Sequence, residues 1–292
     1  MACKYKYEAS VIVPTYNRSA LLKQTLNTLL KQDISKEKFE VIVVDDGSTD
    51  NTEYVVNEYK NKLNIKYYKQ EHNGFRVASI RNIGIKKSEG DICIFVDSGV
   101  LVKSNGINSN IKTHKCNENI AVIGYMYGFD EYNENEEIIN KMHIDSLNVD
   151  GYIEELEKKE IYDLREKLYS KLGDDIDKWP APWAIFWTGY ASVKRDLLIS
   201  VGMFDENFNS WGGEDVDLAL NLYVHHVKFV FNRELKSIHL PHEKFKASVE
   251  SEELKKRTVK KRQYIHEKYK LKTTELYINM SSFELNEKFF GK

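Results

Sequence analysis

Residues 41–50 read VIVVDDGSTD, a run of branched apolar side chains that ends abruptly in acidic, glycine and hydroxyl residues. Such apolar β-branched runs are typical of strands that are buried on both faces, as in parallel sheets. The polar residues that follow are frequent in turns, and Ser and Asp also cap helices. The stretch predicts a buried strand over 39–44, then a turn, then a helix over 52–60.

The same alternation of strand and helix continues on both sides of this stretch. Towards the N-terminus, ASVIVP at 9–14 predicts a strand closed by Pro14, and the leucine stripe in 20–32 predicts a helix capped by Ser19. Further along we expect strands at 65–69 and 91–96 and a helix at 77–87. Strand–helix–strand units form right-handed crossovers, so the sequence predicts a doubly wound α/β fold with a mostly parallel central sheet.

Composition bounds the rest of the chain. The 292 residues are 41% hydrophobic and 30% charged, which is typical of a folded globular protein. Between 131 and 178 the sequence shifts to Glu, Lys, Asn and Asp with helical spacing, which predicts a helical insertion. A basic tract at 250–272 predicts a helical tail, either solvated or in peripheral contact with an anionic membrane.

Charge and cysteine usage exclude several classes of partner. A formal net charge of −2 gives no positive field for nucleic acid, which we therefore do not expect to bind. The cysteines at 3, 93 and 116 are odd in number and widely spaced, which fits ordinary thiols in a reducing compartment. No apolar run approaches a membrane span, so we expect a cytoplasmic protein, possibly membrane-associated; an oligomer stays possible.

Polar clusters follow three of the expected strands. In parallel sheets ligands bind beyond the carboxyl ends of the strands, so Thr15, Tyr16 and Arg18 are expected to meet Asp46 and Asp97 at one edge. Asp46 is placed to accept from a uracil N–H or a ribose hydroxyl. Asp97 offers a hard oxygen ligand for Mg²⁺ or Mn²⁺ beside a diphosphate. Turn formation and helix capping alone explain both clusters equally simply.

Further candidates for holding a phosphate or a metal lie elsewhere in the chain. His239 and His242 follow an expected strand at 228–232 and offer imidazole ligands, although histidines are more often structural. His225 and His226 are expected inside a helix, without a ligand role. Arg76 and Arg81 flank a helix start, where arginine and helix N-terminus together suit a diphosphate; the alternative is ordinary surface arginines.

The motif WGGEDVD at 211–217 opens another expected helix. Gly212 and Gly213 permit close approach of a ligand to the backbone, and carboxylates in a first turn are favoured by the helix dipole. Crowding of Glu214 and Asp215 with a third carboxylate raises at least one pKa towards the range of a general base. Helix capping explains the same residues.

Large aromatic side chains crowd the loop at 179–187 and its surroundings. They offer a flat platform on which a sugar ring could stack, and core packing is the equal alternative. The residues are Trp179, Trp183, Phe186, Trp187 and Tyr190.

In order, VIVPTYN at 11–17, VIVVDDGSTD at 41–50, NGFRVASIRNIGI at 73–85 and FVDSG at 95–99 resemble glycosyltransferase family 2. The later WTGYASVKRDLLISVGMFDENFNSWGGEDVDLAL at 187–220 resembles the C-terminal WGGED signature of β-1,4-galactosyltransferases and chondroitin-polymerase-type enzymes.

The resemblance implies a GT-A fold, an inverting mechanism and a UDP-sugar donor. It implies a domain over 1–245, with a nucleotide-binding half at 1–100, the insertion at 131–178 and an acceptor half at 179–245, followed by a tail at 246–292. It further implies that Asp215 is the base, that Glu214 orients the acceptor hydroxyl, and that Asp97 with His239 or His242 binds Mn²⁺ or Mg²⁺. The implied donor residues are Pro14, Thr15, Tyr16, Arg18, Asp46, Arg76, Arg81, Asp97 and Ser98, and the implied acceptor residues are Trp187, Gly189, Trp211, Gly212 and Gly213.

One departure from the family pattern concerns the metal. Gly99 stands where a second Asp, or sometimes His, is usual, so the affinity for a metal and its identity stay open. The transferred sugar stays open among galactose, N-acetylgalactosamine, N-acetylglucosamine and glucose, with galactose-type donors favoured by the WGGED resemblance. The acceptor is a glycan, a lipid-linked sugar, a small molecule or a peptide.

Two other classes of protein share parts of this pattern. A nucleotidyltransferase would carry a glycine-rich phosphate loop with a lysine early in the chain, and residues 14–18 contain none. A non-catalytic sugar- or nucleotide-binding subunit is favoured by Gly99 and opposed by the Glu214–Asp215 pair.

Overall fold

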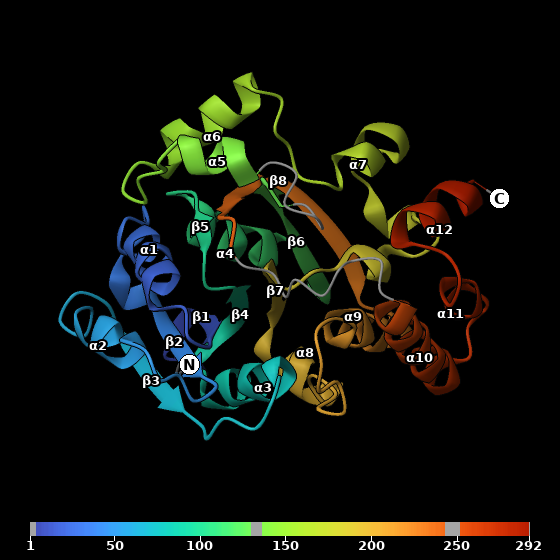
Figure 1. Ribbon diagram of the computed structural model, residues 1–292, viewed down its shortest axis with the longest axis horizontal. Coiled ribbons are helices and arrows are strands. Elements are labelled where there is room, and N and C mark those ends of the chain that lie inside the picture. The colour runs from blue at the N-terminus through green and yellow to red at the C-terminus, as the bar shows by residue number, and fades with distance from the viewer. Residues whose placement is uncertain (1–3, 130–135, 243–251, 292) are drawn as a thin grey trace.

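The computed structural model describes residues 4–129, 136–242 and 252–291. These residues form a central eight-stranded sheet, in the order β3-β2-β1-β4-β7-β6-β8-β5, surrounded by helices (Figure 1). The boundaries expected at 131 and at 245/246 lie outside the described residues. The strands are β1 Tyr7–Thr15, β2 Phe39–Asp45, β3 Ile65–Lys69, β4 Gly90–Val96, β5 Val100–Val102, β6 Ile120–Tyr127, β7 Tyr190–Lys194 and β8 Lys228–His239.

The N-terminal half of the sheet is wholly parallel, as the sequence predicts. Strands β3, β2, β1 and β4 pair side by side, with Val11 opposite Val41. Helices cover both faces, because Val11 and Val13 pack with the leucines of α1 (Ser19–Leu30) while Ile12 packs with α3 (Val77–Lys87). The expected α/β fold with a mostly parallel sheet is confirmed.

The second half of the sheet mixes directions. Strand β7 runs antiparallel to β4 and β6, β5 runs antiparallel to β8, and β6 and β8 are parallel to each other. Strand β8 is longer than expected, so His239 is its last residue and does not follow a loop. Outside the insertion and the tail, the α-helices of this half are α4 Gly106–Cys116, α8 Arg195–Ser200 and α9 Glu214–Val224. His225 and His226 lie after α9, not inside it.

Two helix boundaries differ from expectation, the start of α1 and the end of α2. Ser19 is the first residue of α1 and not its cap, because its N–H donates to Oδ2 of Asp50 (2.9 Å). The other oxygen of Asp50 accepts from the N–H (3.1 Å) and hydroxyl (2.5 Å) of Thr52. One carboxylate thus serves the starts of both α1 and α2. Helix α2 is shorter than expected and spans Thr52–Asn57.

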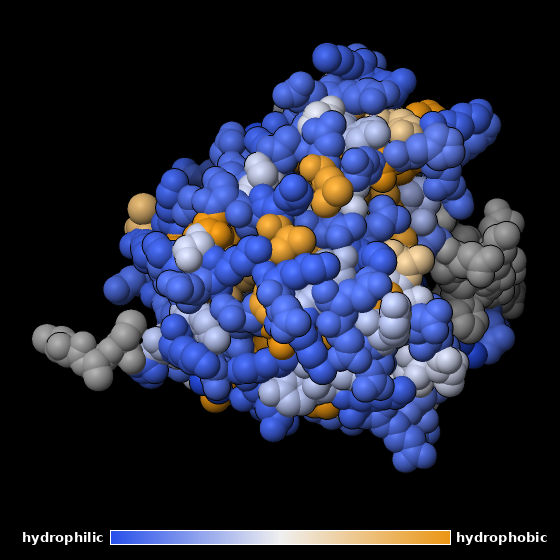
Figure 2. Space-filling model, turned by 90° about the vertical axis from the view of Figure 1, so that its left-hand side faces the viewer, coloured by the Kyte–Doolittle hydropathy of each residue, from blue (hydrophilic) through white to orange (hydrophobic). Residues whose placement is uncertain are grey.

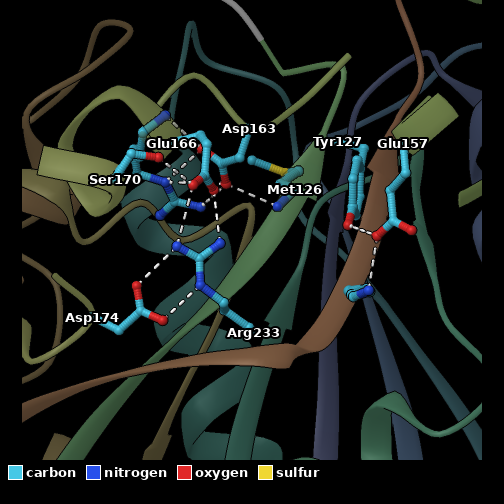
Figure 3. Close-up of polar contacts among 10 residues, drawn as sticks. Met126, Tyr127, Glu157, Asp163, Glu166, Ser170, Asp174 and Arg233 are labelled. Atoms are coloured by element: carbon cyan, nitrogen blue, oxygen red, sulfur yellow. Dashed lines mark hydrogen bonds and ion pairs between the residues drawn. The ribbon is translucent and has the colours of Figure 1, made fainter. Parts of the chain in front are cut away.

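The insertion and the tail are helical, as expected. The insertion contains α5 Glu136–Lys141, α6 Val149–Lys158 and α7 Glu166–Leu172, and the tail contains α10 Glu252–Tyr269, α11 Lys272–Tyr277 and α12 Ser282–Phe289. Helix α12 packs against α7, and α10 lies beside α9 (Figure 1). Ion pairs join the insertion to the sheet, since Arg233 of β8 bonds both Glu166 and Asp174 (Figure 3).

Most of the aromatic loop belongs to the core, which corrects the expectation of a sugar platform there. Trp179, Trp183, Phe186 and Tyr190 are all at most 3% exposed, whereas Trp187 is half-buried. The surface around α1 and α2 is largely hydrophilic, with small scattered apolar areas (Figure 2). Among the described residues, no helix is long and apolar enough to cross a membrane.

Candidate active site

Loops after the parallel strands meet at one edge of the sheet and are tied to one another. The backbone N–H of Asn17, after β1, donates to Oγ of Ser48 (2.8 Å), and Oδ1 of Asn17 accepts from the N–H of Thr49 (2.8 Å). Asn17 adopts a positive φ of 49°, which this reciprocal bonding stabilises. The first two strand-end clusters therefore form one rigid rim.

The two adjacent aspartates at the end of β2 have different environments. Asp45 is fully buried and accepts from the Tyr67 hydroxyl (2.6 Å) and the Ser48 N–H (2.8 Å), so its role is structural. Asp46 instead accepts from Nε2 of Gln70 (2.5 Å) and from Arg76 (3.2 Å). The structure thus brings together Asp46 and Arg76, two residues predicted for donor binding.

An aromatic pair lies beside Asp46. The ring of Tyr16 stacks on the ring of His72, with centroids 4.1 Å apart and planes 7° apart, and Nδ1 of His72 lies 2.9 Å from the Asp46 carbonyl. The neighbouring Thr15 hydroxyl is buried and has no hydrogen-bond partner in the part of the chain that the structure describes. An unpartnered buried hydroxyl at a strand end is suited to a ligand. Sequence reasoning missed Gln70 and His72, because nothing in their spacing links them to Asp46.

A buried arginine connects the strand edge with the WGGED segment. The two terminal nitrogens of Arg81 donate to Oδ1 of Asp97 (2.9 Å) and to Oε1 of Glu214 (3.0 Å). Arg81 is 3% exposed; burial opposes its charge, but both carboxylates outweigh that effect and raise its pKa. The guanidinium of Arg81, which was expected to bind a diphosphate, therefore already bonds two carboxylates. Arg18 lies near Asp97, and burial lowers its pKa while Asp97 opposes that change.

Two predicted donor residues bond each other. Ser98 is buried and its hydroxyl donates to the carbonyl of Pro14 (2.8 Å). A role of either residue in donor binding stays a prediction. Gly189 lies where expected, beside Asp97: its carbonyl accepts from the Asp97 N–H (3.1 Å), and a Cβ on it would lie 3.8 Å from Asp97 Oδ2.

The segment before α9 is a tight turn that only glycine accommodates easily. Gly212 and Gly213 have φ of 84° and 101°, a region that L-residues rarely adopt. A Cβ on Gly213 would lie 2.8 Å from the ring of Phe208. The turn leaves Trp211 71% exposed and starts α9 at Glu214. The predicted acceptor residues Trp211, Gly212 and Gly213 thus directly precede the predicted catalytic pair.

The carboxylates that open α9 have different environments. Burial, followed by the neighbouring charge of Glu214, raises the pKa of Asp215 to about 7, with Arg81 opposing this rise. A carboxylate with such a pKa can accept a proton near neutral pH. Oε2 of Glu214 is buried and makes no hydrogen bond to any described residue. It is therefore available to accept a hydrogen bond from a ligand hydroxyl.

The histidines lie close to Asp97 through pairing of β5 and β8. His239 is opposite Val100, and the N–H of Leu240 donates to the carbonyl of Gly99 (2.9 Å). The rings of His239 and His242 are 5.1 Å apart. Among the described residues, no three His, Cys, Asp or Glu gather as a complete metal site. Oδ2 of Asp97 makes no hydrogen bond to another described side chain, and binding of an ion by Asp97 with one of these imidazoles stays a prediction.

The insertion reaches this site through Trp187. Arg165 is 1% exposed and bonds Asp163, the carbonyl of Gly124 (2.8 Å) and the carbonyl of Ile185 (3.2 Å). Its guanidinium carbon lies 4.9 Å from the Trp187 ring centroid. Asp163 also accepts from the N–H of Met126, an interaction visible in Figure 3. The insertion therefore fixes the one aromatic side chain of the 179–187 loop that stays half-buried.

A scan of protein families gives a match to the model described as glycosyl transferase family 2, over residues 10–201. The chain belongs to glycosyl transferase family 2. The match ends before Trp211, so it does not cover the WGGED segment or the tail.

Relatives and solved structures agree with this family. The chain is 37% identical over 246 residues to validoxylamine A glucosyltransferase of Streptomyces hygroscopicus subsp. jinggangensis, covering 80% of this chain and 56% of that protein. It is 32% identical to chondroitin synthase of Pasteurella multocida, covering 73% of this chain and 23% of that protein. The chain thus spans about half of the first relative and less of the second.

A structural neighbour shows the fold. The crystal structure of residues 1–349 of Staphylococcus aureus TarS in complex with UDP-GlcNAc superimposes with a TM-score of 0.62 and 23% identity. The superposition covers 89% of this chain and 66% of that one. The expected GT-A-type architecture of this family 2 chain is confirmed.

Proposed function

We propose that this chain is an inverting glycosyltransferase that transfers a sugar from a UDP-sugar to a nucleophile, usually a hydroxyl, of an acceptor. One observation carries the proposal: Arg81 bonds both Asp97, at the strand edge suited to a nucleotide, and Glu214, next to the proton-accepting Asp215. Donor-side and acceptor-side carboxylates therefore meet at one buried arginine.

On the donor side, each residue has a role that its position supports. Asp46 would accept the uracil N–H, with Arg76 and Tyr16 alongside and the Thr15 hydroxyl available as a further contact. Asp97, with His239 or His242, would hold Mn²⁺ or Mg²⁺. When bound, such an ion neutralises the diphosphate and makes UDP a better leaving group.

On the acceptor side, Asp215 removes the proton of the acceptor hydroxyl. The acceptor oxygen then forms a bond to the anomeric carbon as the bond from that carbon to the diphosphate oxygen breaks, and UDP departs with the electron pair. Attack opposite the leaving group converts an α-linked donor into a β-linked product. Glu214 would orient the hydroxyl through its unpartnered Oε2, and the exposed Trp211 would stack on the acceptor.

The identity of the sugar is a narrower proposal. The relatives include a validoxylamine A glucosyltransferase and a chondroitin synthase, and the TarS neighbour holds UDP-GlcNAc. These support a UDP-hexose or UDP-N-acetylhexosamine donor, and the WGGED resemblance adds the galactose-type donors. An acceptor with sugar-like hydroxyls fits the exposed Trp211.

Turnover tests the proposal directly. UDP release is measured with UDP-glucose, UDP-galactose, UDP-GlcNAc and UDP-GalNAc, each with Mn²⁺ or Mg²⁺ and a set of sugar and polyol acceptors. We expect one donor to be turned over in an acceptor-dependent way. Binding of UDP-sugars without turnover in any combination would favour a non-catalytic binding subunit instead.

A further inference from the structure

The tail helix α10 contacts the turn that presents the proposed catalytic pair. The ammonium group of Lys261 donates three hydrogen bonds to consecutive backbone carbonyls, those of Ser210 (3.1 Å), Trp211 (2.5 Å) and Gly212 (2.9 Å). Three donors on one nitrogen thus meet three acceptors that point the same way. No other described side chain bonds these three carbonyls.

The stem of the same lysine also lies against the turn. A Cβ on Gly213 would lie 3.7 Å from Cδ of Lys261, so the alkyl chain covers the glycine whose φ of 101° starts α9. A cavity of about 280 Å³ separates 207–210 from α10 nearby and is lined by Lys261 and Tyr264. The rings of Phe208 and Tyr264 also meet edge-on across this junction, with centroids 5.6 Å apart, so the lysine bonds hold the turn to the helix together with one aromatic contact.

Helical spacing places further contacts on the same face of α10. Tyr264 and Lys268 follow Lys261 at intervals of three and four residues, so the three side chains share one face. Tyr264 donates to Asp205 (2.8 Å), and Lys268 donates to both oxygens of Asp217 (2.9 and 2.8 Å). This face of α10 thus bonds residues on both sides of the WGGED turn, Asp205 before it and Asp217 after it.

We propose that Lys261 is a positioning residue that holds the turn at 210–213 in the geometry in which Glu214 and Asp215 can act on an acceptor. The inference rests on the proposed function and deepens it, because it assigns to the tail a part in the same site. Lys261 lies outside the residues matched by the family model. A base displaced by about 1 Å loses up to about 10²-fold in rate, so three backbone bonds matter for turnover.

The charge of Lys261 also affects the pKa of Asp215. Glu214 on its own helix and Arg81 on α3 act on the Asp215 carboxylate, and Asp215 in turn acts on Lys261 of α10 and on Tyr277 of α11. Burial lowers the pKa of Lys261, while Glu214 and Asp215 oppose this. Removing the lysine charge raises the pKa of Asp215 further and moves the acidic limb of the pH–rate profile to higher pH.

The test compares Lys261→Met with Lys261→Arg and with Lys255→Met, a control at an exposed position of α10. Hydrogen exchange of the Asp217 amide, which donates to the carbonyl of Gly213 (2.9 Å), is the first readout, because it needs no turnover. We expect about tenfold faster exchange there in Lys261→Met alone. Unchanged exchange overturns the inference whatever the activity. If Lys261→Met does not fold, Lys261→Gln replaces it under the same criteria.

Kinetics give the second readout. In Lys261→Met we expect kcat to fall about 10- to 100-fold with UDP affinity and donor KM within about twofold of wild type, and Lys261→Arg to recover most of kcat. Wild-type kcat in Lys261→Met, or a matching loss of UDP affinity and melting temperature, contradicts a positioning role. A wild type without turnover sinks the proposed function, and the exchange data still decide whether Lys261 holds the turn.

Discussion

Replacing Asp215 by Asn should abolish most turnover while making the folded protein more stable. The amide has the shape of the carboxylate and can keep the bond that Asp215 Oδ1 accepts from the N–H of Val216 (2.8 Å). The amide cannot take up the proton of the acceptor hydroxyl. General-base catalysis contributes about 10²- to 10⁴-fold, so we expect kcat to fall by that factor while UDP still binds.

The gain in stability follows from the sign of the pKa change. Folding raises the pKa of Asp215 from 3.8 to about 7, so its ionised form is disfavoured in the folded state and stability falls as pH rises through this window. At 1.36 kcal/mol per pH unit the full penalty above the folded pKa is about 4 kcal/mol. Allowing for solvent at a half-buried side chain, we expect Asp215→Asn to raise the free energy of unfolding by about 1–3 kcal/mol at pH 8.

Two assays check this prediction. Urea unfolding should show the full stabilisation of Asp215→Asn at pH 8 and less than half of it at pH 5, because the window from 3.8 to about 7 is then only partly crossed. In wild type, kcat/KM should fall about tenfold from pH 8 to pH 6, because a base with a pKa of about 7 is then mostly protonated. Wild-type turnover in Asp215→Asn, or a destabilised variant at pH 8, would refute the reasoning.

Two further substitutions test the nucleotide edge and the catalytic turn. Asp46→Ala should weaken UDP binding about 10- to 100-fold, because a hydrogen bond to a charged group contributes about 1.5–3 kcal/mol. Calorimetry measures the affinity for UDP. An unchanged affinity would show that Asp46 does not bind the uracil. Gly213→Ala should lower the free energy of unfolding by about 1–3 kcal/mol, since it combines a φ of 101° with a contact to Phe208. Gly212→Ala is its matched control, with a φ of 84° and open space around the Cβ, and an equal loss in both variants would show that the Phe208 contact does not matter.

The elements of the N-terminal half were predictable because local signals are strong there. Runs such as VIVVD at 41–45 and DICIFV at 91–96 lie within strands, and β3 and α3 begin and end at the expected residues. Glycines with positive φ at 47, 99, 212 and 213 also occur inside the predicted motifs. Strand direction in the second half was not predictable, because β7 and β5 take their direction from distant partners.

The site was predictable where a motif carries it and missed where it depends on packing. Asp46 meets Arg76, and Asp97 and Glu214 meet at Arg81, although the role of each residue stays a prediction. Whether a tryptophan is buried depends on neighbours far along the chain, so Trp183 and Trp187 could not be told apart from the sequence. Lys261 was missed because it contacts a turn about 50 residues away, and its basic tract is typical of a solvated helix.

Calorimetric titration of UDP and UDP-sugars, each with Mn²⁺, Mg²⁺ or EDTA, on wild type and Asp97→Ala tests the central claim most directly. Melting curves check that the variant folds. We expect that it does, because Arg81 keeps Glu214 as a partner. We expect metal-dependent binding of UDP and at least one UDP-sugar to wild type, and loss of that binding in Asp97→Ala. Wild-type protein that binds no uridine nucleotide under any of these conditions would contradict the claim.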